Sequence, residues 1–507
     1  MLTVNLGEIL ANTIFLFIVF NEIIILIVIN NGRNMLKRIL YVITLFIFSK
    51  DIVTASDNVI QFLDNKNDEY ASMSNTIWGL AELGYQEEKT SELMQSHLKE
   101  ESFSINAGVA NIPTAFIASY GSGKPVIAIL AEMDALPGLS QDAKPERKIL
   151  KKEMPGHACG HNLFGTGSIA ASVAVKNWLM ETGTTGTIRV YGTPAEEGGS
   201  GKVYMVRAGL FRDVDIVMHW HPSDRNDASP ASSLANRSAK FRFFGVPAHA
   251  SAAPEKGRSA LDAVESMNFM INLMREHLPE TARIHYVITK GGDAPNIVPG
   301  NAEVYYYVRH PDVDELERIW ARVIKIAEAA ATGTETTLEY EIMHANRPLL
   351  PNLPLAKMVL EKLNQVGGVY YNKEETVFAK TLWATIDHPN RNLGSEKNIQ
   401  PFEVKIGRGS TDVGGVSWVV PTVGFRTATW VPGTPAHSWQ AVACGGMSIG
   451  HKGMMNAAKT LALSSIHVFQ NPAIVEEAWE TIQNQRGPTF EYYPLLGDRD
   501  PPLNYRD

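Results

Sequence analysis

Residues 125–136 read PVIAILAEMDAL, and this stretch indicates the class of fold. Its short, continuous apolar run is typical of a strand buried on both faces of a parallel sheet. Further strands are expected over residues 187–191 and 213–220, with an amphipathic helix over residues 57–98 and a small-residue helix over residues 164–180. Because these strands alternate with helices, we predict an α/β fold.

The pattern of expected strands and helices changes near Ala239, where the expected order of elements is βαββαβ. This order is the split-βαβ arrangement of ferredoxin-like domains, and we expect it as an insertion in the larger domain, which resumes near Leu350. The expected strands are residues 240–246, 283–289, 303–309 and 336–342, and the expected helices are residues 259–277 and 313–330. The predicted domains are a leader (1–55), a first catalytic part (56–237), an inserted domain (238–346) and a second catalytic part (347–507).

The N-terminal region differs from the rest, because residues 14–29 are almost wholly apolar. A second unit has a basic start at Met35, an apolar stretch over residues 39–49 and a small-residue exit, which together are typical of a secretory signal peptide. We therefore expect an exported protein, periplasmic or secreted, with the upstream run as either a membrane anchor or an extension before a true start at Met35. The alternative is an apolar N-terminal helix packed on the fold.

Composition narrows the class of function. The 507 residues carry 46 Lys and Arg against 54 Asp and Glu, a formal charge of −8, which argues against a nucleic-acid partner bound through broad charge. Two cysteines exclude a disulfide framework and a cysteine-rich zinc module. The 14 histidines are enough for metal or acid–base sites.

Four segments at or just after the ends of expected strands carry residues suited to a metal site. Open α/β sheets place their sites at these strand ends. In the segment PGHACGHN, Cys159 and His161 flank a glycine, and a thiolate with an imidazole favours zinc or another borderline transition metal. In PAEE, neighbouring side chains of an extended segment diverge, so one carboxylate can bind a metal while the other acts as a general base. The other two segments are MHWHP, with His219 and His221, and GTPAHSW, with His437.

Together these segments supply five candidate ligands, which is more than one tetrahedral ion needs and suits a pair of ions. The candidates are Cys159, His161, one glutamate of Glu196 and Glu197, one histidine of His219 and His221, and His437. An ordinary acidic turn or a histidine in the core would explain any one segment taken alone.

The collinear motifs of the chain resemble the M20 family of metallopeptidases and amidohydrolases and, within it, the p-aminobenzoyl-glutamate hydrolase B-subunit group. The resemblance runs from about Asn58 to Asn471. Its motifs are WGLAELG, EMDALPG, GHACGHN, PAEEGGSGK, AHA, GRSALDA, STDV and GTPAHSWQ. Asn162 and Glu132 depart from the family pattern, which more commonly has aspartate at both positions, and Gly415 stands where an acid is expected.

The resemblance implies a role for each site residue. The implied metal ligands are Cys159, His161, Glu197, His221 and His437, with His221 preferred to His219. Glu196 is the implied general base. Asp134 is implied to orient a metal ligand or to adjust the electrostatics of the site. His249 is implied to reach across a dimer into the neighbouring active site, where it stabilises the oxyanion. Asn296 and Arg309 are linked to the carboxylate end of the substrate.

The resemblance also implies a mixed-sheet catalytic domain, two divalent ions (zinc or manganese, with cobalt as a further option), and a homodimer through residues 238–346. A second, paralogous chain is a further possible partner. The expected reaction is hydrolysis of an amide between an acyl or aroyl group and an amino acid. The alternatives are a dipeptidase or carboxypeptidase of the same family, and an inactive exported binding or scaffold protein.

Overall fold

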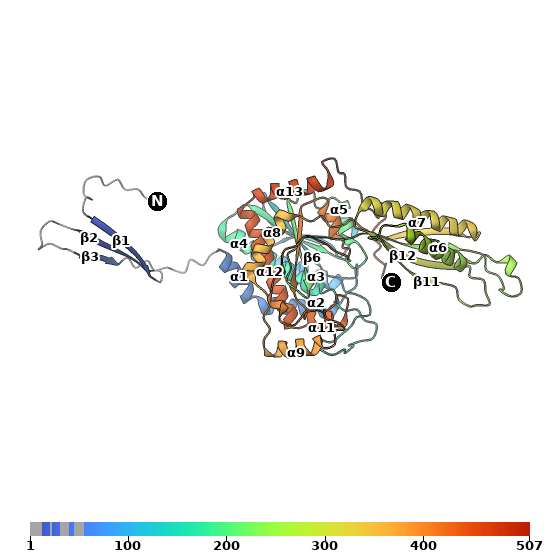
Figure 1. The fold of residues 1–507 in the computed structure, drawn as a ribbon, viewed down its shortest axis with the longest axis horizontal. Helices are drawn as coiled ribbons and strands as arrows, with labels where there is room; N and C mark the ends of the chain where they lie inside the picture. Colours follow the sequence, from blue (N-terminus) through green and yellow to red (C-terminus); the bar gives the residue numbers. More distant parts are fainter. Residues whose placement is uncertain (1–12, 21–22, 31–39, 45–54, 507) are drawn as a thin grey trace. The chain divides into compact units, whose positions relative to one another are not determined.

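The computed structural model describes residues 13–20, 23–30, 40–44 and 55–506, in two units, Met1–Asn58 and Val59–Asp507. In the first unit, three strands form an antiparallel sheet in the order β1-β2-β3 (Figure 1). They are β1 (Thr13–Phe20), β2 (Ile23–Asn30) and β3 (Leu40–Thr44). Isoleucine and valine dominate these segments, and β-branched residues favour strands over helices.

The prediction of an exported chain, with the N-terminal apolar segment as a candidate membrane anchor, is wrong. Within the apolar run, residues 14–20 and 23–29 form strands where an anchor or a packed helix was expected. Among the described residues, the structure holds no helix of the length and apolar character that a membrane crossing requires. Most of the expected signal segment, including residues 45–54, lies outside the described residues.

In the second unit, a six-stranded mixed sheet has the order β15-β8-β6-β7-β5-β4. Its strands are β4 (Ser104–Ala107), β5 (Phe116–Ser122), β6 (Val126–Glu132), β7 (Gly186–Thr193), β8 (Ile216–Ser223) and β15 (Thr422–Ala428). The four strands from β15 to β7 are parallel, β5 is antiparallel to β7, and β4 is antiparallel to β5. Every residue of β6 is buried, as its apolar run predicts, although the strand ends at Glu132 rather than at residue 136.

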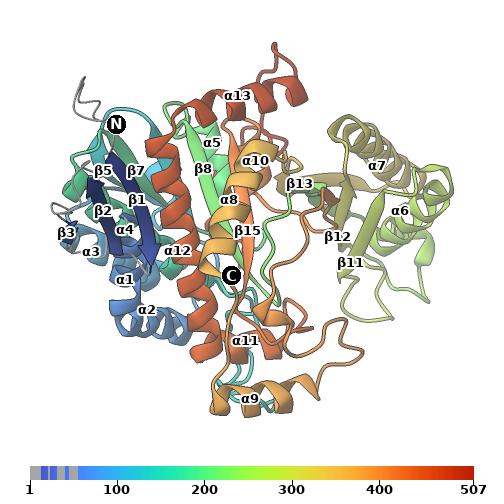
Figure 2. The ribbon, with the colours of Figure 1, turned by 60° about the vertical axis from the view of Figure 1, so that its left-hand side comes forward.

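Helices cover this sheet and contribute most of the core. Helix α4 (His161–Thr182) packs on β6, β7 and β8, and α12 (Ser448–Gln470) packs on α4 and on α8 (Leu353–Val366). In Figure 2, α12 and α8 cross in front of the large sheet. The expected helix over residues 57–98 is three helices, α1 (Ala55–Asn65), α2 (Asn67–Leu80) and α3 (Glu88–Glu100).

The break between α2 and α3 has a physical cause. Ala81 adopts the left-handed conformation (φ 45°), which ends α2. The loop that follows pairs with the chain after β6, because the N–H of Ala135 donates to the carbonyl of Glu82 at 2.8 Å. A continuous helix would leave that N–H without this partner.

The second sheet confirms the expected βαββαβ insertion. Its four antiparallel strands have the order β11-β12-β10-β13, with α6 and α7 on one face (Figure 2). The elements are β10 (Ala235–Phe244), α6 (Ala260–Met274), β11 (Arg283–Lys290), β12 (Asn301–His310), α7 (Val313–Gly333) and β13 (Thr337–Asn346). Along β12, Val304, Tyr306 and Val308 are buried, and the alternate residues face the opposite side.

The remaining described elements are short or peripheral. They are α5 (Gly201–Arg207), α9 (Lys373–Trp383), α10 (Val413–Ser417), α11 (Trp439–Gly445), α13 (Ala473–Arg486), β9 (Ala231–Ser232), β14 (Lys405–Ile406), and the 3₁₀ turns η1 (Val109–Asn111), η2 (Pro254–Lys256), η3 (Arg275–His277) and η4 (Ser395–Lys397).

The C-terminal segment after α13 links the two sheets of this unit. Arg237 on β10 donates to the carbonyl of Leu495 at 2.5 Å, and Arg499 forms an ion pair with Glu341 of β13 at 2.8 Å. Arg506 then donates to the carbonyl of Glu197. The segment therefore reaches from the second sheet to the ends of the central strands, where the candidate site lies.

Candidate metal centre

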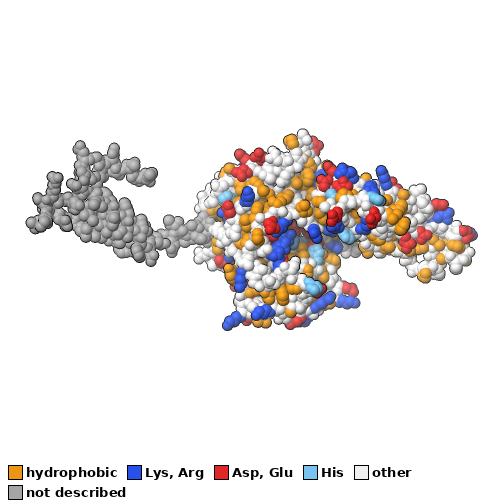
Figure 3. Space-filling model, in the orientation of Figure 1, with side chains coloured by type: hydrophobic (Ala, Val, Ile, Leu, Met, Phe, Trp, Pro, Cys, Tyr) orange, Lys and Arg blue, Asp and Glu red, His pale blue; other side chains and the backbone are white. Residues whose placement is uncertain are grey.

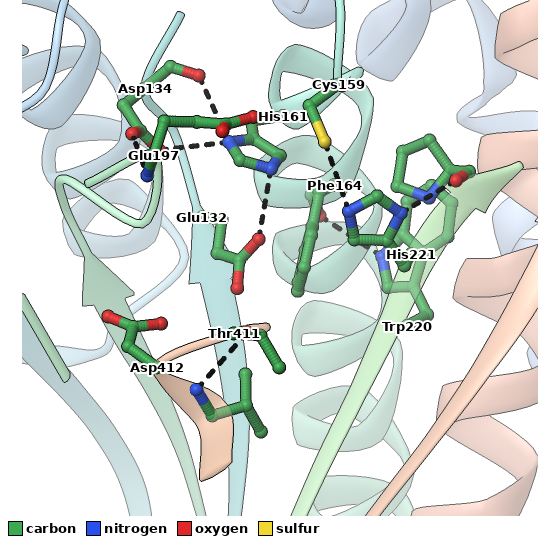
Figure 4. A network of polar contacts seen from close by, with 12 residues as sticks. Glu132, Asp134, Cys159, His161, Phe164, Glu197, Trp220, His221, Thr411 and Asp412 are labelled. Carbon is green, nitrogen blue, oxygen red and sulfur yellow. Dashed lines mark hydrogen bonds and ion pairs between the residues drawn. The ribbon is translucent and has the colours of Figure 1, made fainter. Parts of the chain in front are cut away.

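Cys159 and His161 stand just before and at the start of α4, where the chain turns sharply. Gly160 between them has a left-handed backbone (φ 77°), and a Cβ on it would collide with Pro222. Glycine is therefore the residue that this turn accepts. The turn brings the thiol and the imidazole to the ends of β6, β7 and β8 (Figure 4).

One group of candidate ligands consists of Cys159, His161 and His221, whose ligand atoms all lie within 4.8 Å of one another. Sγ of Cys159 is 3.4 Å from Nε2 of His221, as Figure 4 shows. The other ring nitrogen of His221, Nδ1, lies 2.7 Å from the carbonyl of Pro222. A proton on Nδ1 donates to that carbonyl, which leaves the lone pair of Nε2 toward the cysteine, as a metal ligand requires.

A second group consists of Cys159, Glu197 and His437, again within 4.8 Å of one another. Oε1 of Glu197 is 3.1 Å from Nε2 of His437. Cys159 belongs to both groups, so its sulfur is placed to bridge two cations. Burial, followed by the charge of Glu197, raises the pKa of the Cys159 thiol, and a coordinated cation would reverse this effect because it stabilises the thiolate.

Asp134 supports both groups from behind. It accepts a hydrogen bond from Nδ1 of His161 at 2.9 Å and another from the backbone N–H of Glu197 at 2.8 Å. Burial acts to raise the pKa of Asp134, but the hydrogen bond and charge of His161, the N–H of Glu197 and the charge of Lys202 together outweigh burial, and the pKa is lowered. Asp134 therefore stays charged and holds Nε2 of His161 toward the site.

Glu196 stands beside the candidate ligands. Its carboxylate, the carboxylate of Glu132 and a ring nitrogen of His161 lie within 4.8 Å of one another. Burial, with the negative charges of Glu132 and Glu197, raises the pKa of Glu196 well above the usual value. A carboxylate with a raised pKa is suited to take up a proton and give it back.

A buried ion network below these residues escaped the sequence reasoning. Nζ of Lys202, which is fully buried, lies 2.7 Å from Asp412 and 2.8 Å from Glu132. Burial opposes the charge of Lys202, but these carboxylates raise its pKa overall. Lys202 and Asp412 lie inside the motifs PAEEGGSGK and STDV, and those motifs were the only signal that could have found them.

The donor set fits two divalent cations. It offers one thiolate, imidazole nitrogens and carboxylate oxygens, which borderline transition metals accept. Nε2 of His161 lies 3.1 Å from Oε2 of Glu132, and Oε1 of Glu197 lies 3.1 Å from Nε2 of His437, but neither contact has the geometry of a hydrogen bond. Buried polar atoms of this kind require partners, and a metal ion would supply them.

His219, the alternative to His221, belongs to neither group. Its ring faces Gly424 of β15, and its Nε2 is buried without a hydrogen-bond partner among the described residues. Burial lowers the pKa of His219 to about 3, so this imidazole is neutral. The geometry therefore brings His221, rather than His219, to the candidate metals.

A cavity of about 800 Å³ opens in front of the site, between the two sheets. Cys159, Glu196, Glu197, His221 and His437 line it from one side. The second sheet lines the other side with the free face of β12, namely Tyr305, Tyr307 and Arg309. Figure 3 shows histidine side chains and side chains of the Lys and Arg colour close together near the middle of this face of the second unit.

His249 and Asn296 lie elsewhere. Both are exposed, and the N–H of Ala250 donates to the carbonyl of Asn296 at 3.0 Å, which places the two side chains on neighbouring loops of the second sheet. Nδ1 of His249 accepts from the N–H groups of Ser251 and Ala252. Neither residue lines the cavity of its own chain.

Comparison with known proteins places the chain in a family. Residues 236–335 match the family model of the peptidase dimerisation domain. The chain is 41% identical over 441 residues to the B subunit of p-aminobenzoyl-glutamate hydrolase from Escherichia coli strain K12, covering 82% of this chain and 92% of the relative. It is 28% identical over 429 residues to the Xaa-Arg dipeptidase of Mus musculus, covering 82% and 89%.

Solved structures share the fold. An aminobenzoyl-glutamate utilization protein from Klebsiella pneumoniae matches with a TM-score of 0.55 at 18% identity, over 81% of this chain and 98% of that one. A dinuclear metal-binding peptidase of the M20 family from Bacillus subtilis matches with a TM-score of 0.54 at 16% identity, over 80% and 99%. Fold, site and relatives define an enzyme that hydrolyses amide bonds. The chain belongs to the M20 family of metallopeptidases and amidohydrolases.

Proposed function

We propose that this enzyme hydrolyses the amide bond between an acyl or aroyl group and an amino acid, with aminobenzoyl-glutamate as the model substrate. The observation that carries the proposal is the pair of ligand groups that share Cys159, with Glu196 beside them and a cavity in front. The 41% identical relative named for this hydrolysis supports the choice of substrate.

Cys159, His161 and His221 would hold one divalent cation, and Cys159, Glu197 and His437 would hold the other, with zinc, manganese or cobalt as candidates. When bound, the two ions supply Lewis acidity and lower the pKa of a water molecule. Glu196 takes the proton of the attacking water and delivers it to the departing nitrogen, as its raised pKa allows. Asp134 keeps His161 oriented throughout.

The second sheet supplies the binding residues in this proposal. Arg309 lines the cavity, and its guanidinium suits the carboxylate end of the substrate because it can contact both oxygens. His249 and Asn296, which lie outside the cavity of their own chain, would reach the site of a second copy and stabilise the oxyanion and the substrate there. We therefore propose a homodimer formed through the inserted domain, residues 238–346. Along the chain, this domain stands between the two catalytic parts, residues 56–237 and 347–507.

The relatives suggest one further candidate partner and one second candidate function. The A subunit of p-aminobenzoyl-glutamate hydrolase from Escherichia coli strain K12 is 28% identical over 269 residues, so a second, paralogous chain is a candidate partner. The Xaa-Arg dipeptidase of Mus musculus favours dipeptide hydrolysis as the second candidate function.

The decisive experiment uses the full chain, loaded separately with zinc and manganese. Metal content is measured, and hydrolysis of aminobenzoyl-glutamate is compared with hydrolysis of dipeptides that end in arginine. We expect about two ions per chain and faster turnover of aminobenzoyl-glutamate. Faster turnover of the dipeptides would favour the second candidate function over this proposal. A chain that binds no metal and turns over neither substrate would instead indicate an inactive binding protein.

The general-base role predicts the effect of Glu196→Gln. This variant should bind metal as the wild type does but lose about 10²- to 10⁴-fold in kcat, because the amide cannot accept the proton. Steady-state kinetics and metal analysis check the two halves of the prediction. Glu153→Gln, in a side chain that is 84% exposed, is the matched control and should keep wild-type kcat. If Glu196→Gln turns over the substrate at nearly the wild-type rate, Glu196 is not the general base.

A further inference from the structure

Arg426 on β15 projects into the cavity beside the candidate metal centre. In the parallel pairing of β15 with β8, Arg426 is the register partner of His221, and register partners point to the same face of a sheet. The flanking residues Phe425 and Thr427 point away and are buried, whereas Arg426 is exposed and lines the cavity. Its guanidinium is therefore next to a candidate ligand and open to a substrate.

The guanidinium of Arg426 has no hydrogen-bond or ion-pair partner in the described part of the chain. Its two acidic neighbours are already engaged by other cations. Asp224 is 3.0 Å from Arg225 and 3.3 Å from Arg391, and Asp227 is 3.4 Å from Arg225 and 3.7 Å from Lys405. A guanidinium on a cavity wall that no neighbouring carboxylate pairs with is free to bind an anion.

Arg309 gives the opposite wall of the cavity a second guanidinium of the same kind. It packs on the ring of Tyr307 at 5.3 Å, its Nε is buried without a hydrogen-bond partner, and within residues 55–506 it forms no ion pair with an acid. The cavity therefore presents two unpaired arginines, one from each sheet. Its remaining charged lining residues are carboxylates of the candidate metal centre.

We propose, as an extension of the proposed function, that Arg426 determines specificity by binding one carboxylate of a dicarboxylic amino acid while Arg309 binds the other. A planar guanidinium pairs with both oxygens of a carboxylate, so two arginines match the two carboxylates of an N-acyl glutamate or aspartate. The same pair repels a substrate that ends in arginine. The substrate class is therefore N-acyl amino acids with an acidic side chain.

The test compares three substrates that differ only in charge: aminobenzoyl-glutamate, aminobenzoyl-glutamine and the α-amide, aminobenzoyl-isoglutamine. The wild type should prefer glutamate. Arg426→Gln should lower kcat/KM for aminobenzoyl-glutamate on the order of 10- to 100-fold, mainly through KM. Of the two amide substrates, one lacks the carboxylate that Arg426 binds, and Arg426→Gln should change kcat/KM for that substrate little. Arg309→Gln should change kcat/KM little for the other amide substrate. Arg426→Lys should restore part of the loss.

Arg408→Gln is the matched control, because Arg408 is an exposed arginine that does not line the cavity, and it should behave as the wild type. Calorimetric binding of free glutamate and free arginine adds a readout without turnover: glutamate should bind more weakly to Arg426→Gln, and arginine should bind poorly to the wild type.

The outcomes separate this inference from the proposed function. Equal losses on all three substrates, or no loss on any, would overturn the role of Arg426. A wild type that hydrolyses the three substrates without preference overturns this inference alone, whereas a metal-loaded wild type that hydrolyses none overturns the proposed function. If circular dichroism shows Arg426→Gln to be unfolded, the preference of the wild type and the kinetics of Arg426→Lys decide.

Discussion

Cys159 shows how much one side chain contributes when two groups of residues converge on it. It lies within 4.8 Å of ligand atoms from His161 and His221 on one side and from Glu197 and His437 on the other. A thiolate is compact and polarisable, so it can serve two borderline cations where an imidazole nitrogen serves one. The proposed two-metal chemistry therefore depends on Cys159 more than on any single histidine.

A buried histidine outside the candidate ligand groups makes the free energy of unfolding depend on pH. His451 on α12 is 9% exposed, and its Nε2 is 2.9 Å from Oδ1 of Asn75 on α2. Burial lowers the pKa of His451 from 6.5 to about 4. As pH falls through this window, the unfolded chain takes up the proton first, so the free energy of unfolding drops, by about 2 kcal/mol at pH 5.

His451→Gln should remove this part of the pH dependence, because glutamine does not titrate. Chemical denaturation at pH 7.5 and pH 5 measures it: the wild type should lose more stability than the variant between the two values. His277→Gln, at an exposed position, is the control and should keep the wild-type difference. Identical pH dependence in wild type and His451→Gln would rule out this contribution.

Among the elements, the strands of the large sheet position the site by where they end. Strands β6, β7 and β8 are parallel, so their carboxyl ends meet at one edge, and the start of α4 lies at the same edge. Glu132 ends β6, Glu196 and Glu197 follow β7, and His221 lies near the end of β8. This arrangement gathers residues that are far apart in the chain.

Close packing between β15 and β8 gives a prediction about Gly424. A Cβ on Gly424 would overlap the ring of His219, its register partner on β8. Gly424→Ala should therefore displace this buried ring and lower the free energy of unfolding by about 1–3 kcal/mol, as overpacking in a core does. Urea denaturation measures the change.

Gly333→Ala makes the same chemical change where there is room. Gly333 ends α7, and a Cβ there would meet nothing within 4 Å. This variant should be as stable as the wild type or gain up to about 1 kcal/mol, because alanine favours helix over glycine. If Gly424→Ala proves as stable as Gly333→Ala, the β15–β8 contact is looser than described.

In the second unit as a whole, the second sheet leaves an apolar surface uncovered. Phe269 and Leu273, one turn apart on α6, are 66% and 55% exposed, and Val287 on β11, which ends the row of strands, is 55% exposed. Exposed apolar residues beside an open strand edge are typical of an interface. This surface belongs to the region that matches the peptidase dimerisation domain.

If this surface forms the proposed homodimer, a charge in it should separate the two copies. Phe269→Glu should shift the enzyme to a monomer in light scattering and reduce hydrolysis, because His249 would no longer reach a neighbouring site. Val377→Glu on α9, at a side chain that is 65% exposed, is the control and should leave both properties unchanged. A Phe269→Glu variant that keeps the wild-type mass would place the interface elsewhere.

Much of this fold was predictable because local patterns carry it. The buried run of β6, the alternation along β12 and the apolar periodicity of α7 each follow from hydrophobic positions a few residues apart. The expectation of an anchor or helix at residues 14–20 and 23–29 was wrong because a short apolar run has the same composition in a helix and in a strand. The break after α2 was missed because its cause is a distant partner, the N–H of Ala135.

For the site, the chain alone indicated which residue types were available and that they followed strand ends, and this was enough to propose a metal-dependent hydrolase. The three-dimensional arrangement assigned Cys159 to both ligand groups, buried Lys202 between Asp412 and Glu132, and left Arg426 unpaired beside His221. Apart from the pairs of Cys159 with His161 and Glu197, these relations join positions about 60 to 280 residues apart, separations that only strand register and close packing can set. Local sequence contains the chemical groups, but the distances between them depend on the packing of the whole unit.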